Sequence, residues 1–117
     1  MIVNLTDHDV VILDEEGNEK IVFKPSGHVA RIKQERTFMF KYPTKEGDIP
    51  IYKDDTFLDF DGVKIQPLTI YIVSWLFLKE LRIQRPDLLN QFVAPNTYNQ
   101  PKGPNGEVVG VQSFIVL

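Results

Sequence analysis

Cysteine is absent from this chain of 117 residues, so disulfides, thiolate metal sites and a cysteine nucleophile are all excluded. Long apolar stretches are also missing, since the longest, at 70–78, is far shorter than the roughly 20 residues that a membrane-crossing helix needs. The amino terminus lacks the basic region of a secretory signal. We therefore expect a cytoplasmic protein with no membrane partner.

An excess of basic charge is missing too. Thirteen Lys and Arg against sixteen Asp and Glu give a net charge of −3, and the basic residues are scattered along the chain. The densest basic stretch, at 31–36, also carries Glu35, which is typical of a solvated strand. Because binding to duplex nucleic acid depends on clustered cations that neutralise phosphates, we expect no such partner.

The composition that remains is that of a globular protein. Hydrophobic residues make up 43% of the chain, with eight Phe and four Tyr to supply large buried areas. The length matches one compact unit, so we expect a single domain over 1–117.

Short β-branched and aromatic segments between turn residues predict six to eight strands. We expect a hairpin from 9–13 and 19–23, with Gly17 in its turn, and a second hairpin over 57–65 around Asp61-Gly62. Further strands are expected at 28–32, 37–42 (ended by Pro43), 49–53, 69–74 and in the last segment, 107–117.

One helix is predicted after the buried strand at 69–74. Ser74 is suited to cap it, apolar residues then recur at helical spacing, and the helix should end near Gln84, where Pro86 begins a short helical turn. Residues 91–106 indicate a loop, or a weak strand followed by one, and Gly110 indicates a bulge or a close approach of another backbone. The expected fold class is α+β, mostly β: one antiparallel sheet, open or barrel-like, with the main helix packed on it.

Three catalytic or metal-binding patterns are considered and not favoured. His8 and His28 have no tight ligand spacing, so no metal is expected. A Ser-His-acid set can be assembled on paper, but no GxSxG motif supports it. An acidic cluster could serve a metal-assisted hydrolase, but it also matches the solvent-exposed face of a strand. The cluster comprises Asp54, Asp55, Asp59 and Asp61.

The favoured candidate site consists of small polar side chains and the guanidinium group of one arginine. Each lies next to an apolar strand, and Ser74 stands at a helix start, where free amides favour an anion. If their strands are neighbours, these side chains converge on one ligand-binding pocket; otherwise they form turns and a helix cap. The set is Asn4, Thr6, His8, Ser26, Gly27, Arg31 and Ser74.

The ordered series NLTxH at 4–8, PSGxxAR at 25–31, YIVS at 71–74 and NGxVVG at 105–110 resembles a family of small proteins of unassigned function. That family is encoded by bacteriophages, prophages, archaeal viruses and actinobacterial plasmids. The chain departs from it at Asp7, where members tend to have Pro, and in the longer link at 91–104. The resemblance implies a mobile-element origin, with the host cytoplasm as location, and implies little about mechanism.

Three function classes follow. The first is a non-enzymatic protein that captures a small anionic or nucleotide-like ligand without a cofactor. The second is a virion structural, assembly or interaction protein that self-associates through exposed aromatic residues, namely Phe38, Phe40, Tyr42, Trp75 and Phe77. The third is the metal-assisted hydrolase.

Overall fold

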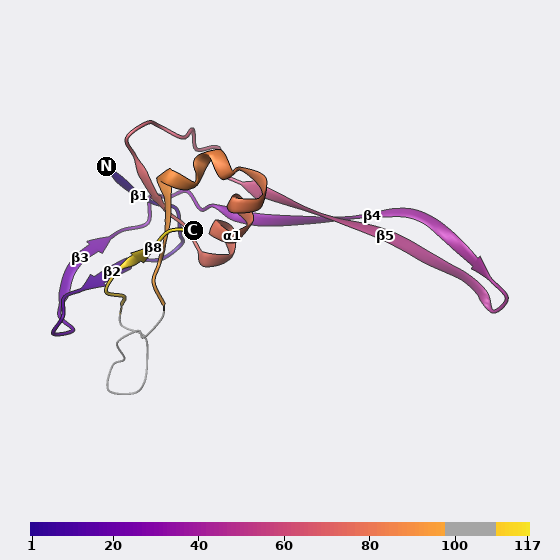
Figure 1. Cartoon of the computed structure of the whole chain (residues 1–117), viewed down its shortest axis with the longest axis horizontal. Coiled ribbons are helices and arrows are strands. Elements are labelled where there is room, and N and C mark those ends of the chain that lie inside the picture. The colour runs from indigo at the N-terminus through magenta and orange to yellow at the C-terminus, as the bar shows by residue number, and fades with distance from the viewer. Residues whose placement is uncertain (98–109) are drawn as a thin grey trace.

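The computed structural model describes residues 1–97 and 110–117. Its elements, in chain order, are β1 (Ile2–Asn4), β2 (Val10–Leu13), β3 (Glu19–Phe23), β4 (Arg31–Thr44), β5 (Gly47–Asp59), β6 (Ile70–Ile72), α1 (Trp75–Gln84), the 3₁₀ helix η1 (Pro86–Gln91), β7 (Phe92–Pro95) and β8 (Phe114–Ile115). They form a body and one long projecting hairpin (Figure 1).

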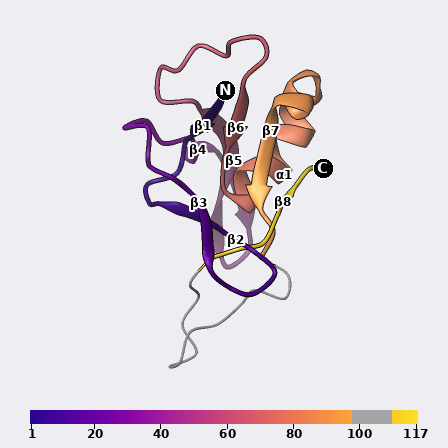
Figure 2. The same ribbon diagram turned by 90° about the vertical axis from the view of Figure 1, so that its left-hand side faces the viewer.

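The body is built around a four-stranded sheet with the order β1-β6-β7-β8. β6 runs parallel to both β1 and β7, and β8 pairs antiparallel to β7. The parallel pair β6 and β7 is connected through α1, because parallel neighbours need a crossover rather than a tight turn. Figure 2 shows α1 behind β7.

Helix α1 supplies much of the core. Its residues Phe77, Leu78 and Leu81 are fully buried and pack with Tyr71 of β6 and Phe92 of β7. The Ser74 hydroxyl oxygen accepts a hydrogen bond from the Phe77 amide at 3.1 Å, so the predicted cap is confirmed. The helix ends at Gln84 before Pro86, which begins η1, as predicted.

The predicted amino-terminal hairpin is confirmed as β2 and β3, with Gly17 at a φ of 84°. Its apolar residues share a second core cluster with Val111. Gly110 lies against β2 so closely that a Cβ atom there would be 2.8 Å from the Val11 carbonyl oxygen. The expected close backbone approach at Gly110 is therefore present.

The strands β4 and β5 form a hairpin of their own, which we call the arm. Its ladder runs from Arg31 paired with Asp59 to Thr44 paired with Gly47, with a bulge at Met39. The molecule measures 66 × 39 × 24 Å and has a radius of gyration of 19.2 Å, compared with about 13 Å for a compact chain of this length. The arm accounts for the elongation, since it extends away from the body (Figure 1).

The mostly-β α+β class with one main helix is confirmed, but the single antiparallel sheet and its barrel-like closure are wrong. The strands divide among a four-stranded mixed sheet and two separate hairpins. The short strands expected at 28–32 and 37–42 merge into β4, which begins at Arg31, and the strand expected at 49–53 merges with the first residues of 57–65 into β5, so Pro43 lies within a strand.

The hairpin predicted at 57–65 is also wrong. Asp61 and Gly62 do adopt positive φ angles, of 56° and 75°. The Asp61 carboxylate, however, accepts a hydrogen bond from the Val29 amide at 2.9 Å, which holds this turn against the start of β4. The chain then continues as irregular structure to β6 because residues 57–59 already pair with β4.

The last strand is shorter than predicted: β8 covers only Phe114–Ile115, and residues 98–109 lie outside the described range. The weak strand considered within 91–106 is present as β7. Among the described residues, no helix has the length and apolar character needed to cross a membrane.

Candidate functional site

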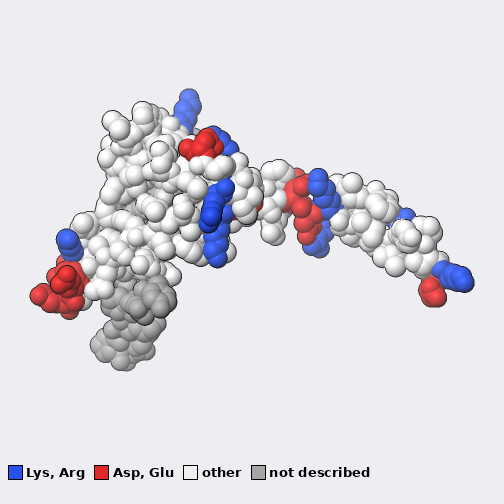
Figure 3. All heavy atoms as spheres, in the orientation of Figure 1, with Lys and Arg blue, Asp and Glu red and all other residues white. Residues whose placement is uncertain are grey.

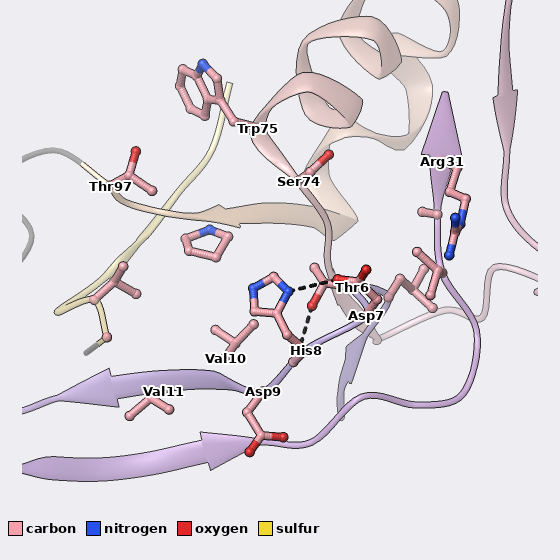
Figure 4. A pocket seen from close by; sticks show the side chains of 16 residues that line it. Thr6, Asp7, His8, Asp9, Val10, Val11, Arg31, Ser74, Trp75 and Thr97 are labelled. Atoms are coloured by element: carbon pink, nitrogen blue, oxygen red, sulfur yellow. Dashed lines mark hydrogen bonds and ion pairs between the residues drawn. The ribbon is translucent and has the colours of Figure 1, made fainter. Parts of the chain in front are cut away.

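A hollow of about 480 Å³ opens on the body where the segment after β1, the start of β4 and the start of α1 meet. Four of the seven predicted site residues line it: Thr6, His8, Arg31 and Ser74. The volume lies within the range of about 300–1,000 Å³ that is usual for small-molecule pockets. Figure 4 shows His8 and Val10 on one side of this hollow and Ser74 and Trp75 at the start of α1 on the other.

Asn4 is not among the residues that line the hollow. Its side chain is only 2% exposed. The Asn4 Nδ2 group donates to the carbonyl oxygens of His8 and Phe23, both at 2.9 Å, and Oδ1 accepts from the Thr6 amide at 2.9 Å. Asn4 therefore ties the end of β1 to the end of β3, which is a structural role.

Ser26 and Gly27 also lie outside the lining of the hollow. The Ser26 hydroxyl oxygen accepts from the His28 amide at 3.3 Å, and the Ser26 amide donates to the Asn4 carbonyl oxygen at 3.0 Å. Gly27 has a φ of 95°, which favours glycine. These two residues build the turn that leads into β4.

Several polar groups of the hollow are already engaged with neighbours. His8 Nδ1 lies 3.0 Å from the Asp7 carboxylate, and this hydrogen bond holds the pKa of Asp7 below its usual value. Asp9 forms an ion pair with Lys24 at 3.1 Å. The rim thus carries two carboxylates beside Arg31 and His8, a mixed rather than a purely positive lining.

Sequence reasoning missed the apolar part of the hollow. The side chains of Leu5, Val10, Ala30 and Val111 form much of its wall, together with the half-buried ring of Trp75. All of them except Trp75 are buried core residues, so only their position beside the polar loop marks them.

The acidic residues proposed for a hydrolase are spread along β5 and its end. Asp54 forms a two-point contact with Arg36, at 2.7 and 2.9 Å, which lowers the pKa of Asp54. Asp59 pairs with Lys33 at 2.9 Å. Within residues 1–97 and 110–117, no group of three or more His, Asp or Glu side chains is placed to hold a metal.

The arm presents a second candidate surface, which lies beyond the body. Phe40 is paired with Ile51 and Tyr42 with Ile49 across the ladder, and paired residues point to the same side of a hairpin. We call these four residues the apolar face; their exposed fractions run from 37% to 59%. The opposite side of the same segment carries Lys41, Pro43, Asp48 and Pro50.

Charged residues separate this distal segment from the body. We call them the charged belt: Glu35, Arg36, Lys53, Asp54 and Asp55. Figure 3 shows the belt as a band of red and blue partway along the arm, with an almost uncharged stretch beyond it and charges again at the tip.

Of the aromatic residues predicted to be exposed, Phe38, Phe40 and Tyr42 are about half exposed on the arm. Trp75 is half-buried, and the expectation for Phe77 is wrong, since its ring is fully buried in the core. A usable signal for the arm was the mirrored alternation of FKYP at 40–43 and DIPI at 48–51 around a polar turn.

Comparisons of the chain with protein-family models, with curated proteins and with solved structures find no match.

Proposed function

We propose that this protein is a structural or assembly protein that associates with further copies of itself through the arm. The observation that carries the proposal is the apolar face, four large side chains that are one third to three fifths exposed at the end of a projecting hairpin. Contiguous apolar surface of this kind marks interaction sites on soluble proteins.

The architecture of the arm supports the same conclusion. A two-stranded hairpin is at best marginally stable in water without a third strand or a packed face. Beyond the charged belt, the described residues offer the arm no such support, because β4 and β5 pair only with each other. A neighbouring molecule would supply the missing contact.

The resemblance to proteins of phages and other mobile elements gives this proposal its biological setting. Small virion proteins assemble in many copies, and an extended arm suits such repeated contacts. We propose a non-enzymatic virion or virion-assembly role.

The test is the molar mass of the full chain by size-exclusion chromatography with light scattering, over a wide range of concentration. We expect a mass above the 13.5 kDa of one chain that rises with concentration. The control is a variant in which residues 38–52 are replaced by a tight Asn-Gly turn, which joins the paired residues Thr37 and Lys53. The shortened variant should remain at the monomer mass; a wild-type mass of 13.5 kDa at every concentration would contradict the proposal.

Capture of a small ligand in the hollow is the second candidate function. The observation in its favour is the convergence of Thr6, His8, Arg31 and Ser74 on one hollow beside the Trp75 ring. Because Asp7 and Asp9 lie on the same rim, a nucleotide-like ligand that pairs an anionic group with a hydrogen-bond-donating ring matches the lining better than a simple anion.

A thermal-shift screen with nucleotides and cyclic nucleotides tests this second candidate. A ligand that binds should raise the melting temperature of the wild-type chain, and Arg31→Gln should reduce that rise. The exposed Arg82→Gln on α1 is the matched control and should leave the rise unchanged. Flat melting curves for every nucleotide would remove the ligand-capture proposal while leaving the proposal for the arm intact.

A further inference from the structure

We infer that the partner of the apolar face is the apolar face of a second copy of this chain, with the two arms packed face to face and antiparallel. This inference rests on the proposed self-association and adds the surface and the geometry through which it occurs.

The two edges of the arm beyond the charged belt, which we call the distal arm, are poorly suited to strand addition. Thr44 and Gly47 close a two-residue turn and therefore form a hydrogen-bonded pair, and hydrogen-bonded and open pairs alternate along an antiparallel ladder. Pro43 and Pro50 occupy the open positions, where the backbone N–H of another residue would point outward. Both edges thus lack a donor near the tip, as on edge strands protected from pairing.

The faces of the distal arm differ in what they can bury. One side presents prolines and charges beyond the exposed aromatic pair Phe38 and Tyr52, and the other presents the four apolar side chains. Face-to-face packing of two such ribbons buries the apolar side chains of both, as in the core between two stacked sheets. The contact is therefore expected between apolar faces rather than between edges.

Charge favours the antiparallel arrangement. Glu35, Lys53 and Asp55 of the charged belt lie on the same side of the ribbon as the apolar face, and Lys45 and Glu46 form the tip. When the arms run antiparallel about the centre of the apolar face, each tip lies over the belt of the other arm at the usual rise of about 3.3 Å per residue. Lys45 then approaches acidic residues and Glu46 approaches Lys53, whereas parallel arms would bring the acidic Glu35 of one copy against Asp55 of the other.

The area buried between the two arms determines how tightly they are expected to bind each other. Side chains of this size carry about 200 Å² each and are about half exposed, so four of them contribute about 400 Å² per copy and about 800 Å² in total. Stable specific interfaces bury about 1,200 Å² or more. The arms alone should therefore form a reversible, concentration-dependent dimer.

A lipid surface is the other environment that accepts an amphipathic segment. The distal arm carries Lys41 and Lys45 against Glu46 and Asp48, so it lacks the cationic excess that holds peripheral proteins on anionic membranes. A second protein copy is the better match.

The absence of cysteine allows a clean cross-linking test on the full chain. Ile49→Cys places one thiol on the apolar face, and Lys41→Cys places one on the opposite side of the same segment. With a short bismaleimide, we expect Ile49→Cys to give a covalent dimer and Lys41→Cys to give about tenfold less. Equal cross-linking of the two variants would overturn the inference.

Paired substitutions supply an independent measurement by sedimentation equilibrium. Phe40→Thr with Ile51→Thr should weaken dimerisation about tenfold or more, while Phe38→Thr with Tyr52→Thr, a similarly exposed aromatic pair on the other side, should change it little. The reverse order would refute the face assignment but leave self-association standing. A wild-type chain that stays monomeric, or that is monomeric and co-floats with lipid vesicles, would overturn both proposals.

Discussion

Substitution of Asn4 by Ala should destabilise the fold strongly without any ligand being involved. The side chain makes three hydrogen bonds to backbone groups of Thr6, His8 and Phe23, each 2.9 Å long, and it is buried. A buried hydrogen bond contributes about 1 kcal/mol net, so the loss of three gives about 3 kcal/mol. For a chain of this length that corresponds to a fall in melting temperature of about 10–15 °C.

Urea unfolding followed by tryptophan fluorescence measures this change, with all variants at one low protein concentration so that self-association contributes equally. Asn4→Asp sharpens the test. Its carboxylate still accepts a hydrogen bond but has no N–H to donate to the two carbonyl oxygens, so the loss of free energy of unfolding should be at least as large as for Asn4→Ala. The exposed Asn90→Ala is the control and should lie within about 0.5 kcal/mol of wild type. A loss below about 1 kcal/mol for Asn4→Ala would refute a structural role for this residue.

Three further predictions concern backbone fit, capping and acid. Gly110→Ala should cost about 1–3 kcal/mol in urea unfolding, because the new Cβ atom would meet the Val11 carbonyl oxygen at 2.8 Å; a neutral result would contradict the close approach. Ser74→Ala should lower the free energy of unfolding by about 1 kcal/mol through loss of the helix cap, and Ser74→Asp should restore most of it. The pKa of Asp59 is held below its usual value of 3.8, chiefly by the backbone N–H of Asp61, so its stabilisation is present at neutral pH and is lost as the pH falls through the folded-state pKa. Asp59→Asn should therefore flatten the decline of stability measured below about pH 4.

Several parts of the fold that depend on neighbouring residues could be predicted from the sequence. Ser74 before an apolar helical pattern defined the start of α1, and Pro86 defined its end. The polar turn around Gly17 gave the hairpin of β2 and β3. These signals are local, because a cap or a tight turn is formed by residues a few positions apart.

The sheet arrangement depends on contacts that leave no local signal. β1 pairs with β6, whose residues lie nearly seventy positions away, and two strands that pair in parallel look like any other short apolar segments. Four of the seven predicted site residues share the hollow because the turn after β1, the start of β4 and the start of α1 meet there. Asn4 does not line the hollow. It is buried where these segments meet, and its side chain hydrogen-bonds to backbone groups there.

The projection of the arm from the body could not be predicted, because alternation reports which side of a strand is apolar but not whether that side faces a core. Phe40 and Tyr42 carry the same pattern as a buried strand. Pro43 predicts a strand end, but a proline is tolerated where its missing N–H would point away from the partner strand. The resemblance to mobile-element proteins stays a prediction.

Amide hydrogen exchange of the full chain, followed by mass spectrometry at low and high protein concentration, tests self-association through the arm most directly. Peptides from residues 38–52 should exchange rapidly when the protein is dilute and become protected as the concentration rises, while peptides from β6 and α1 should keep the same protection throughout. Arm peptides whose exchange does not change with concentration would contradict the account.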